Sequence, residues 1–324
     1  MTSKPKYKLT NETMTKFGIT FRRIELLRDV AGYRKGTMMG WVEKESNLDQ
    51  SGNALVYGDA RVYGNALVSG DALVYGDALV YGNARVSGDA RVYGNALVYG
   101  DALVYGDALV YGNARVSGDA RVYGNALVYG NAHVSGNALV YGNARVSGDA
   151  LVSGDARVYG NARVSGDALV SGNAHVYGDA RVYGDARVYG DAHVYGNAHV
   201  YGDARVSGNA HVSGNAHVSG DAHVYGNAHV IVVSSIEGYT LTVWREPTGH
   251  GAHWSFEKRD ITTAESWLPE NHKTLAPYLQ ARVAEWPVDE PVTVDPHAEL
   301  REQLAAAEAQ VASVREALEA VVPA

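Results

Sequence analysis

A six-residue repeat runs without interruption from Gly52 to Ile231, and it constrains the fold more than any other feature of this chain. Each repeat reads Gly, then Asn or Asp, then Ala, then Leu, Arg or His, then Val, and finally Tyr or Ser; only the last repeat ends differently, in Ile231. Gly, Ala and Val never change. The other three positions accept charged, polar and apolar residues alike.

This alternation of constant and variable positions is typical of a strand that buries one face and exposes the other. Ala and Val are predicted to point inward. The variable residues must point outward, because a buried position could not accept an unpaired Arg in place of Leu. Gly followed by Asn or Asp supplies the turn, since both tolerate a positive φ. Each repeat is therefore one short strand and one corner.

The pattern resembles the hexapeptide repeat of left-handed β-helices, in which three repeats form one triangular coil. The resemblance implies an all-β solenoid over residues 52–231, with thirty repeats in about ten parallel coils and a length of roughly 48 Å. The repeat alone leaves a flattened, two-sided coil of twelve residues open. If Val points inward, Val140→Asp should unfold the middle coils, whereas the outward Tyr141→Ser should change stability little.

Residues 1–51 differ from the repeats and are predicted to form a small N-terminal β cap over the open end of the solenoid. The stretch Ile19–Ile24 has strand character, and Trp41 and Val42 follow a turn bounded by Gly. Together with the first repeats, the segments K-Y-K-L-T, G-I-T-F-R-R-I-E-L-L-R-D-V and G-W-V-E-K-E-S-N-L resemble uncharacterised hexapeptide-repeat proteins of bacteriophages and prophages. The resemblance implies a phage-like origin but no known activity.

Three further segments follow the repeats. Residues 232–286 are predicted to form a small α+β cap, with a hairpin from Tyr239–Trp244 to His253–Glu257 and then a helix. Residues 287–296 are a Pro-rich acidic linker. Residues 297–324 carry a heptad pattern that predicts a coiled-coil helix for oligomerisation, with packing of an amphipathic helix within the chain as the alternative. The heptad positions are Leu300, Leu304, Ala307, Val311, Val314, Leu318 and Val321.

The composition excludes several classes of function. A net charge of -8 disfavours nucleic acid as a partner, and the absence of Cys rules out disulfide bonds. No apolar run approaches the roughly 20 residues of a membrane span, and the start of the chain leads into no signal-peptide core. We expect no membrane partner, and a location in the host cytoplasm or in a virion.

The superfamily resemblance also raises enzymatic hypotheses, because related β-helices include acyltransferases and zinc carbonic anhydrases. Those enzymes build their pockets from loops extruded between coils or from facing subunits. This chain has no insertion in its thirty repeats, and a smooth face offers no concave site. We therefore predict that it is not an enzyme and that it needs no cofactor.

Two polar columns at an interval of 18 residues raise the question of metal binding. His175, His193, His211 and His229 should stack on one face, where parallel side chains diverge and favour a solvated polar surface. A column of carboxylates at one corner would repel itself and invite a cation such as calcium, although Asn and Asp are equally common there. The members of this weak candidate site are Asp149, Asp167, Asp185, Asp203 and Asp221.

The N-terminal half of the solenoid is richer in outward Leu and Tyr, and one face concentrates them, interrupted by Arg91. Such a patch favours a partner-binding surface. The alternative is that identical side chains on neighbouring strands stack in like-on-like ladders and stabilise the sheet. The predicted interface residues are Leu55, Tyr57, Leu73, Tyr75, Tyr93, Leu109, Tyr111, Leu127 and Tyr129.

The sequence therefore predicts a non-catalytic structural or protein-interaction component of phage origin that presents a rigid β-helical rod. A tail or fibre accessory of the virion is one form of this hypothesis, and an intracellular protein that blocks a host factor is the competing one. The expected partner is a second copy, with a trimer favoured by analogy, or another protein.

Overall fold

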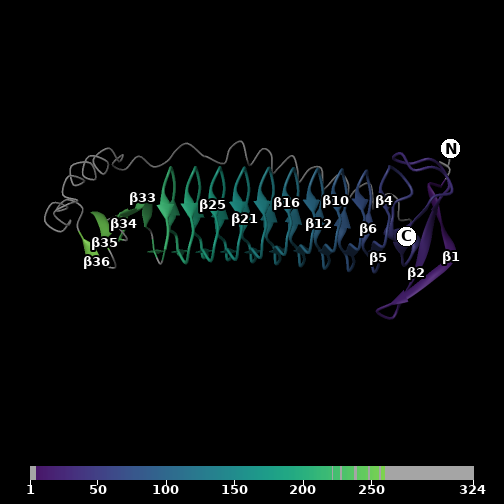
Figure 1. Cartoon of the computed structure of the whole chain (residues 1–324), viewed down its shortest axis with the longest axis horizontal. Coiled ribbons are helices and arrows are strands. Elements are labelled where there is room, and N and C mark those ends of the chain that lie inside the picture. Colours follow the sequence, from purple (N-terminus) through teal and green to yellow (C-terminus); the bar gives the residue numbers. More distant parts are fainter. Residues whose placement is uncertain are drawn as a thin grey trace, which may run out of the picture. The chain divides into compact units, whose positions relative to one another are not determined.

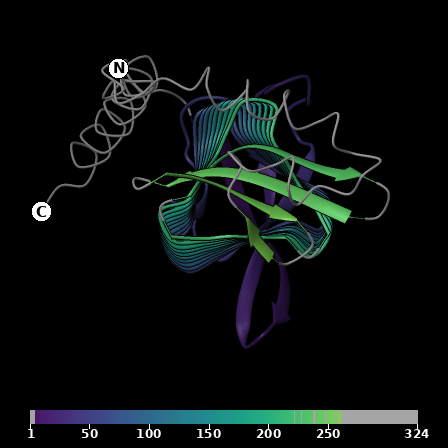
Figure 2. The ribbon, with the colours of Figure 1, turned by 90° about the vertical axis from the view of Figure 1, so that its left-hand side faces the viewer.

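The computed structural model describes residues 5–220, 222–226, 228–236, 239–246, 249–254 and 257–259, with side chains up to residue 228. Three sheets of thirteen, ten and thirteen strands run along the repeat region (Figure 1). Each coil adds one two-residue strand to every sheet, so neighbouring strands of a sheet are 18 residues apart, as in the pairing of Leu55 with Leu73. Seen along the solenoid, successive coils superimpose (Figure 2). The three-sided coil is confirmed, and the twelve-residue coil is wrong.

We name the sheets in the order in which the chain first enters them, through β1, β4 and β6 respectively. Sheet 1 consists of β1 (Tyr7–Lys16), β2 (Ile19–Leu26), β3 (Met38–Val42), β5 (Arg61–Val62), β8 (Leu79–Val80), β11 (Leu97–Val98), β14 (Arg115–Val116), β17 (His133–Val134), β20 (Leu151–Val152), β23 (Leu169–Val170), β26 (Arg187–Val188), β29 (Arg205–Val206) and β32 (His223–Val224). Sheet 2 consists of β4 (Leu55–Val56), β7 (Leu73–Val74), β10 (Arg91–Val92), β13 (Leu109–Val110), β16 (Leu127–Val128), β19 (Arg145–Val146), β22 (Arg163–Val164), β25 (Arg181–Val182), β28 (His199–Val200) and β31 (His217–Val218). Sheet 3 consists of β6 (Leu67–Val68), β9 (Arg85–Val86), β12 (Leu103–Val104), β15 (Arg121–Val122), β18 (Leu139–Val140), β21 (Arg157–Val158), β24 (His175–Val176), β27 (His193–Val194), β30 (His211–Val212), β33 (His229–Ile236), β34 (Tyr239–Glu246), β35 (Gly249–Trp254) and β36 (Glu257–Arg259).

The core of the solenoid consists of the constant Ala and Val residues. From Ala54 to Val218 every one of them is fully buried. Backbone hydrogen bonds join the coils at each outward position, for example from the Arg145 N–H to the Ala162 carbonyl at 2.9 Å. Small and β-branched side chains thus fill the interior, while the backbone groups that they accompany are satisfied by the next coil. The predicted inward positions are confirmed.

The corners depend on glycine for two reasons, which Gly148 illustrates. Its φ is +69°, in the left-handed region that L side chains rarely adopt. A Cβ atom at this position would also lie 2.9 Å from the backbone nitrogen of Gly166 in the next coil. Any side chain would therefore both strain the turn and push the two coils apart.

The N-terminal segment extends sheet 1 and covers the first coil. β1 and β2 form an antiparallel hairpin, which projects from the coils in Figure 2, and β3 pairs in parallel with β5. The buried Lys6 donates from Nζ to the carbonyls of Ser51 and Ala54, at 3.2 and 2.8 Å. Asn47 donates from Nδ2 to the carbonyl of Ala66 at 2.9 Å. These contacts satisfy carbonyl groups that have no preceding coil, and the predicted strand at 19–24 is confirmed as part of β2.

Beyond the last coil, β33 to β36 continue sheet 3 as an antiparallel meander. The predicted hairpin is present as β34 and β35, although β35 begins at Gly249, four residues before the expected start. The helix expected after it, the linker and the heptad segment lie outside the described residues. The single helical element of the described chain is the 3-10 turn η1 (Glu45–Asn47), and no helix in this part is long and apolar enough to span a membrane.

Candidate functional site

The predicted interface residues do share one face, the N-terminal half of sheet 2. Its Leu residues lie on β4, β7, β13 and β16, with Arg91 of β10 between them. The tyrosines form one stacked ladder, from Tyr57 through Tyr75, Tyr93 and Tyr111 to Tyr129, with ring centroids 4.7–5.0 Å apart and nearly parallel planes. Apart from Leu55, these Leu and Tyr side chains are half-buried. The sheet thus provides the like-on-like ladder that the sequence offered as an alternative.

Leu55 corrects the predicted patch. Its side chain is fully buried, β3 of the N-terminal segment contacts β4, and Lys6 donates to the carbonyl of the adjacent Ala54, so the chain's own N-terminal segment covers this position. The neighbouring Tyr57 packs against Tyr33 with ring centroids 5.5 Å apart. Burial, with the adjacent Tyr33 and Tyr75 rings, raises the pKa of Tyr57 to about 12. The surface available to a partner therefore begins one coil later, at Leu73.

A second tyrosine ladder, on sheet 3, was missed in the sequence. Six rings from Tyr105 to Tyr195 stack at 4.8–5.0 Å. Four of them are buried, including Tyr141 at 6% and Tyr159 at 2% exposure, yet they lie outside the Ala and Val core. Burial raises the pKa of Tyr141 to about 12 against an opposing effect of Arg157. The sequence signal for this ladder is the recurrence of Tyr every 18 residues. The burial of Tyr141 also means that it is not an exposed side chain that can be replaced without loss of stability.

The histidine column on sheet 3 is confirmed as a stack. The ring centroids of His175 and His193 are 4.7 Å apart, and those of His193 and His211 are 4.8 Å apart. Each ring also meets a tyrosine of the preceding coil edge-on, as His193 does with Tyr177 at 6.2 Å. His229 pairs with His211 through its backbone. The His rings form a row of their own, which carries Leu139 and Arg157 in the preceding coils and lies beside the tyrosine row.

A related pair lies on sheet 2, where the rings of His199 and His217 are 4.8 Å apart. Burial lowers the pKa of His199, and the adjacent His217 and Arg181 lower it further, because a second positive charge in the stack is unfavourable. Burial and Arg115 likewise lower the pKa of His133 on sheet 1. These rings are thus held in their neutral form.

The carboxylate column occupies one corner, and its described side chains are exposed. Neighbouring corner residues bond from coil to coil at most positions where Asn precedes, as Asn131 does when its Nδ2 donates to Asp149 Oδ1 at 2.8 Å. Such amide ladders recur at all three corners. The side chains of Asp167, Asp185 and Asp203 carry no amide group and cannot donate to the next coil. Asp221 lies outside the described residues. In the described part of the chain no three His, Asp or Glu side chains are grouped so that they could hold a metal ion.

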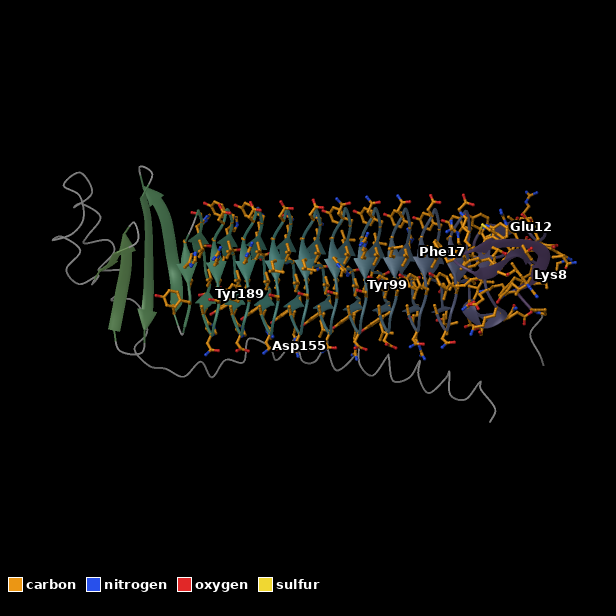
Figure 3. The ribbon with its side chains drawn as sticks, turned by 90° about the horizontal axis from the view of Figure 1, so that it is seen from below. Lys8, Glu12, Phe17, Tyr99, Asp155 and Tyr189 are labelled. Atoms are coloured by element: carbon orange, nitrogen blue, oxygen red, sulfur yellow. The ribbon has the colours of Figure 1, made fainter. Side chains whose placement is uncertain are left out.

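Outward side chains therefore run in straight rows along the solenoid (Figure 3), where Tyr99 and Tyr189 of sheet 1 and the corner residue Asp155 are labelled. The hairpin of β1 and β2 ends in Phe17, which is 72% exposed. The predicted oligomerisation residues from Leu300 to Val321 lie outside the described residues. What the described molecule offers is a set of flat, regular ladders.

The comparison with protein families agrees with the solenoid repeat. The family model described as the YdcK beta solenoid repeat matches fourteen segments, which together cover residues 60–178, 180–196 and 198–214. The coils match this solenoid repeat. The match supports the predicted β-solenoid superfamily, whereas the resemblance to phage and prophage proteins stays a prediction. Among curated proteins, none matches the chain.

Two solved structures are similar to the chain at low identity. LpxA from Acinetobacter baumannii has a TM-score of 0.29 and 10% identity, over 72% of this chain and 94% of that protein. The UDP-N-acetylglucosamine acyltransferase of Francisella novicida has a TM-score of 0.28 and 13% identity, over 58% of this chain and 67% of that protein. Likenesses this distant transfer no activity to the chain.

Proposed function

We propose that this chain is a non-catalytic structural or protein-interaction component that presents rigid ladders of side chains to a partner. One observation carries the proposal: from β4 to β32 every strand pairing within the solenoid joins residues 18 apart, so the described coils form flat faces without an inserted loop. Small-molecule sites are concave and lined by convergent groups. Flat faces rich in Tyr, Leu and Arg are instead suited to protein partners.

The partner-binding surface we propose is the N-terminal half of sheet 2 from Leu73 to Tyr129. Replacing Leu73, Leu109 and Leu127 together by Arg should weaken assembly, because three charges would have to be desolvated at the contact. Sedimentation measures the assembly, and circular dichroism should stay unchanged. The matched control replaces Leu79, Leu97 and Leu151 of sheet 1 by Arg. Unchanged assembly of the sheet 2 variant would assign the leucines to the ladder alone.

The heptad segment supports self-association as a second, independent element, with a trimer as the proposed state. Sedimentation of the full chain beside a chain that ends at Pro296 tests this element. A lower mass for the shortened chain supports oligomerisation by residues 297–324. An unchanged mass would contradict it and favour packing within the chain.

The proposed phage origin allows two forms of this function. The protein is either a tail or fibre accessory in the virion or a free protein in the host that blocks a host protein. Probing purified particles with a specific antibody separates these two forms, and absence from particles excludes the virion form. Turnover of an acyl-CoA or of bicarbonate by the purified chain would overturn the non-catalytic proposal altogether.

A further inference from the structure

The C-terminal half of sheet 2 stacks like charges directly on one another. Arg145, Arg163 and Arg181 occupy the outward position of β19, β22 and β25, pair strand to strand, and are exposed. The spacing of one coil is that of the stacked rings, 4.7–5.0 Å. Like charges directly opposite each other on neighbouring strands destabilise a sheet. The salt bridges found among the described residues join side chains of the N-terminal segment only, so this arginine ladder has no carboxylate partner within the described chain.

An acidic ladder runs beside it at the same levels. Asp149, Asp167 and Asp185 occupy the corner that follows β19, β22 and β25, four residues after the respective arginines, and Asp203 continues the row. Serines separate the two ladders in the first two of these coils. On the opposite side of the same strands the corner residues are Asn143 and Asn161, whose amides bond along their own column. The face is therefore positive on its strands, negative along one border, and neutral along the other border at these two levels.

We propose that a second copy of this chain covers this face, parallel and level with the first, so that the arginine ladder of each copy meets the aspartate ladder of the other. A twofold axis along the solenoid exchanges the two lateral positions and keeps each level unchanged. Arg145 of one copy then faces Asp149 of the second copy, and the next two coils repeat the contact. Because both ladders share one axial period, a single matched pair aligns the others.

The same geometry excludes the antiparallel arrangement. A twofold axis across the solenoid would keep the lateral position and reverse the levels, which places arginine against arginine. It would also bring the apolar half of sheet 2 against its charged half. In the parallel arrangement the leucines from Leu73 to Leu127, which share a column with the arginines, meet the corner row of the second copy. The tyrosines from Tyr75 to Tyr129 share a column with Ser147 and meet the same row of the second copy. Charge complementarity therefore favours the parallel orientation.

Sheet 2 is also the face that the flanking segments leave unextended. β1 to β3 lengthen sheet 1, and β33 to β36 lengthen sheet 3, whereas every described strand of sheet 2 belongs to a repeat. Ser147 and Ser165 lie between the two charged ladders, at the line where the twofold axis would pass. The small serines leave room for the charged side chains of both copies at these two levels, whereas Tyr183 lies on the same line at the level of Arg181. The inference rests on the proposed function, since it specifies the partner and its orientation, and it replaces the proposed trimer with a dimer of the solenoids.

Charge reversal tests the pairing on the full chain. An acidic variant carries Arg145→Asp, Arg163→Asp and Arg181→Asp; a basic variant carries Asp149→Arg, Asp167→Arg and Asp185→Arg. Alone, each should self-associate at least about tenfold more weakly than the unchanged chain, because like charges then face each other. An equal mixture should associate again, since the acidic face fits the basic one, and added salt should weaken that complex.

A control variant with Arg187→Asp and Arg205→Asp on sheet 1 should associate as the unchanged chain does. The inference is overturned if the unchanged chain is monomeric, if either triple variant associates normally, or if the mixture fails to associate. Loss of assembly in the leucine triple variant with normal assembly of the charge variants would retain the proposed function and remove only this pairing.

Orientation has a separate test, because the chain contains no Cys and a single introduced thiol is unique. Ser147→Cys should be linked to a covalent dimer by a short bis-maleimide, since the two copies of this residue lie across the axis. Ser153→Cys, at the equivalent position on sheet 1, should remain uncrosslinked. Equal crosslinking of the two variants would overturn the parallel arrangement.

Discussion

Leu139 and Val140 are neighbours on β18 but are subject to different constraints. Val140 points inward, is fully buried and has the same identity in every coil, whereas the position of Leu139 is half-buried here and holds Arg or His in neighbouring coils. The residue types of the inner row do not vary, because three sheets share a narrow interior. The outer row needs only a side chain that stacks on its neighbours or reaches solvent. The difference teaches that the inner rows encode the fold, while the outer rows are available to encode partners.

The largest effect should come from a charge in the inner row. Val140→Asp places a carboxylate where no described residue can pair with it, and we expect it to lower the free energy of unfolding by more than about 4 kcal/mol. Chemical denaturation followed by circular dichroism measures the loss. Leu139→Asp, one residue away in the outer row, is the control, with an expected change below about 1 kcal/mol. Similar losses for both variants would contradict the distinction between the rows.

A corner substitution should rank second. Gly148→Ala forces a side chain into the left-handed region and toward the next coil, which should cost about 1–3 kcal/mol. The same denaturation experiment measures this cost. Ser147→Ala, at the preceding residue, should be nearly neutral. A neutral Gly148→Ala would show that the corner relaxes more easily than the 2.9 Å approach implies.

The tyrosine ladders of sheets 2 and 3 offer a sharper comparison within the outer rows. Tyr141→Ser removes a buried ring that stacks on Tyr123 and Tyr159, and should cost about 2 kcal/mol. Tyr93→Ser removes a half-buried ring with two stacked neighbours, and should cost about 1 kcal/mol. Thermal unfolding of the two variants tests the order. Equal melting temperatures would mean that stacking, and not burial, determines the contribution of a ladder.

The smallest effects should appear as pH dependence. The pKa values of the ladder residues Tyr57 and Tyr141 are raised to about 12, so the stability they contribute is fully present below the ordinary value of 10.0 and declines as pH rises through about 12. His133 and His199 have lowered pKa values, so their contribution is present above 6.5 and is lost as pH falls below it. Denaturation midpoints should therefore be highest between these limits. A midpoint that rises from pH 7 to pH 5 would contradict the histidine assignment.

Much of the fold was predictable from the sequence because the constraint is repeated in every coil. Ala54, Val56 and their successors gave the inward face, and the glycine before each Asn or Asp gave the corner. The choice between a twelve- and an eighteen-residue coil was not predictable from the repeat, because both place Ala and Val inside. Pairing of Leu55 with Leu73 decided it. The hand of the coil stays a prediction from the superfamily resemblance.

The candidate sites were less predictable, because exposure is set by what covers a position and not by the repeat. The same pattern places Leu55 and Leu73 in equivalent positions, yet Leu55 is fully buried where the N-terminal segment contacts β4. Tyr141 and Tyr93 are likewise equivalent in the repeat and differ in burial. By itself the sequence determined the inner rows, the corners and the 18-residue columns of Tyr, His and Asp once three repeats per coil are assumed. Only the tertiary structure decided which columns share a face and which are covered, because those relations depend on contacts between residues far apart in the chain.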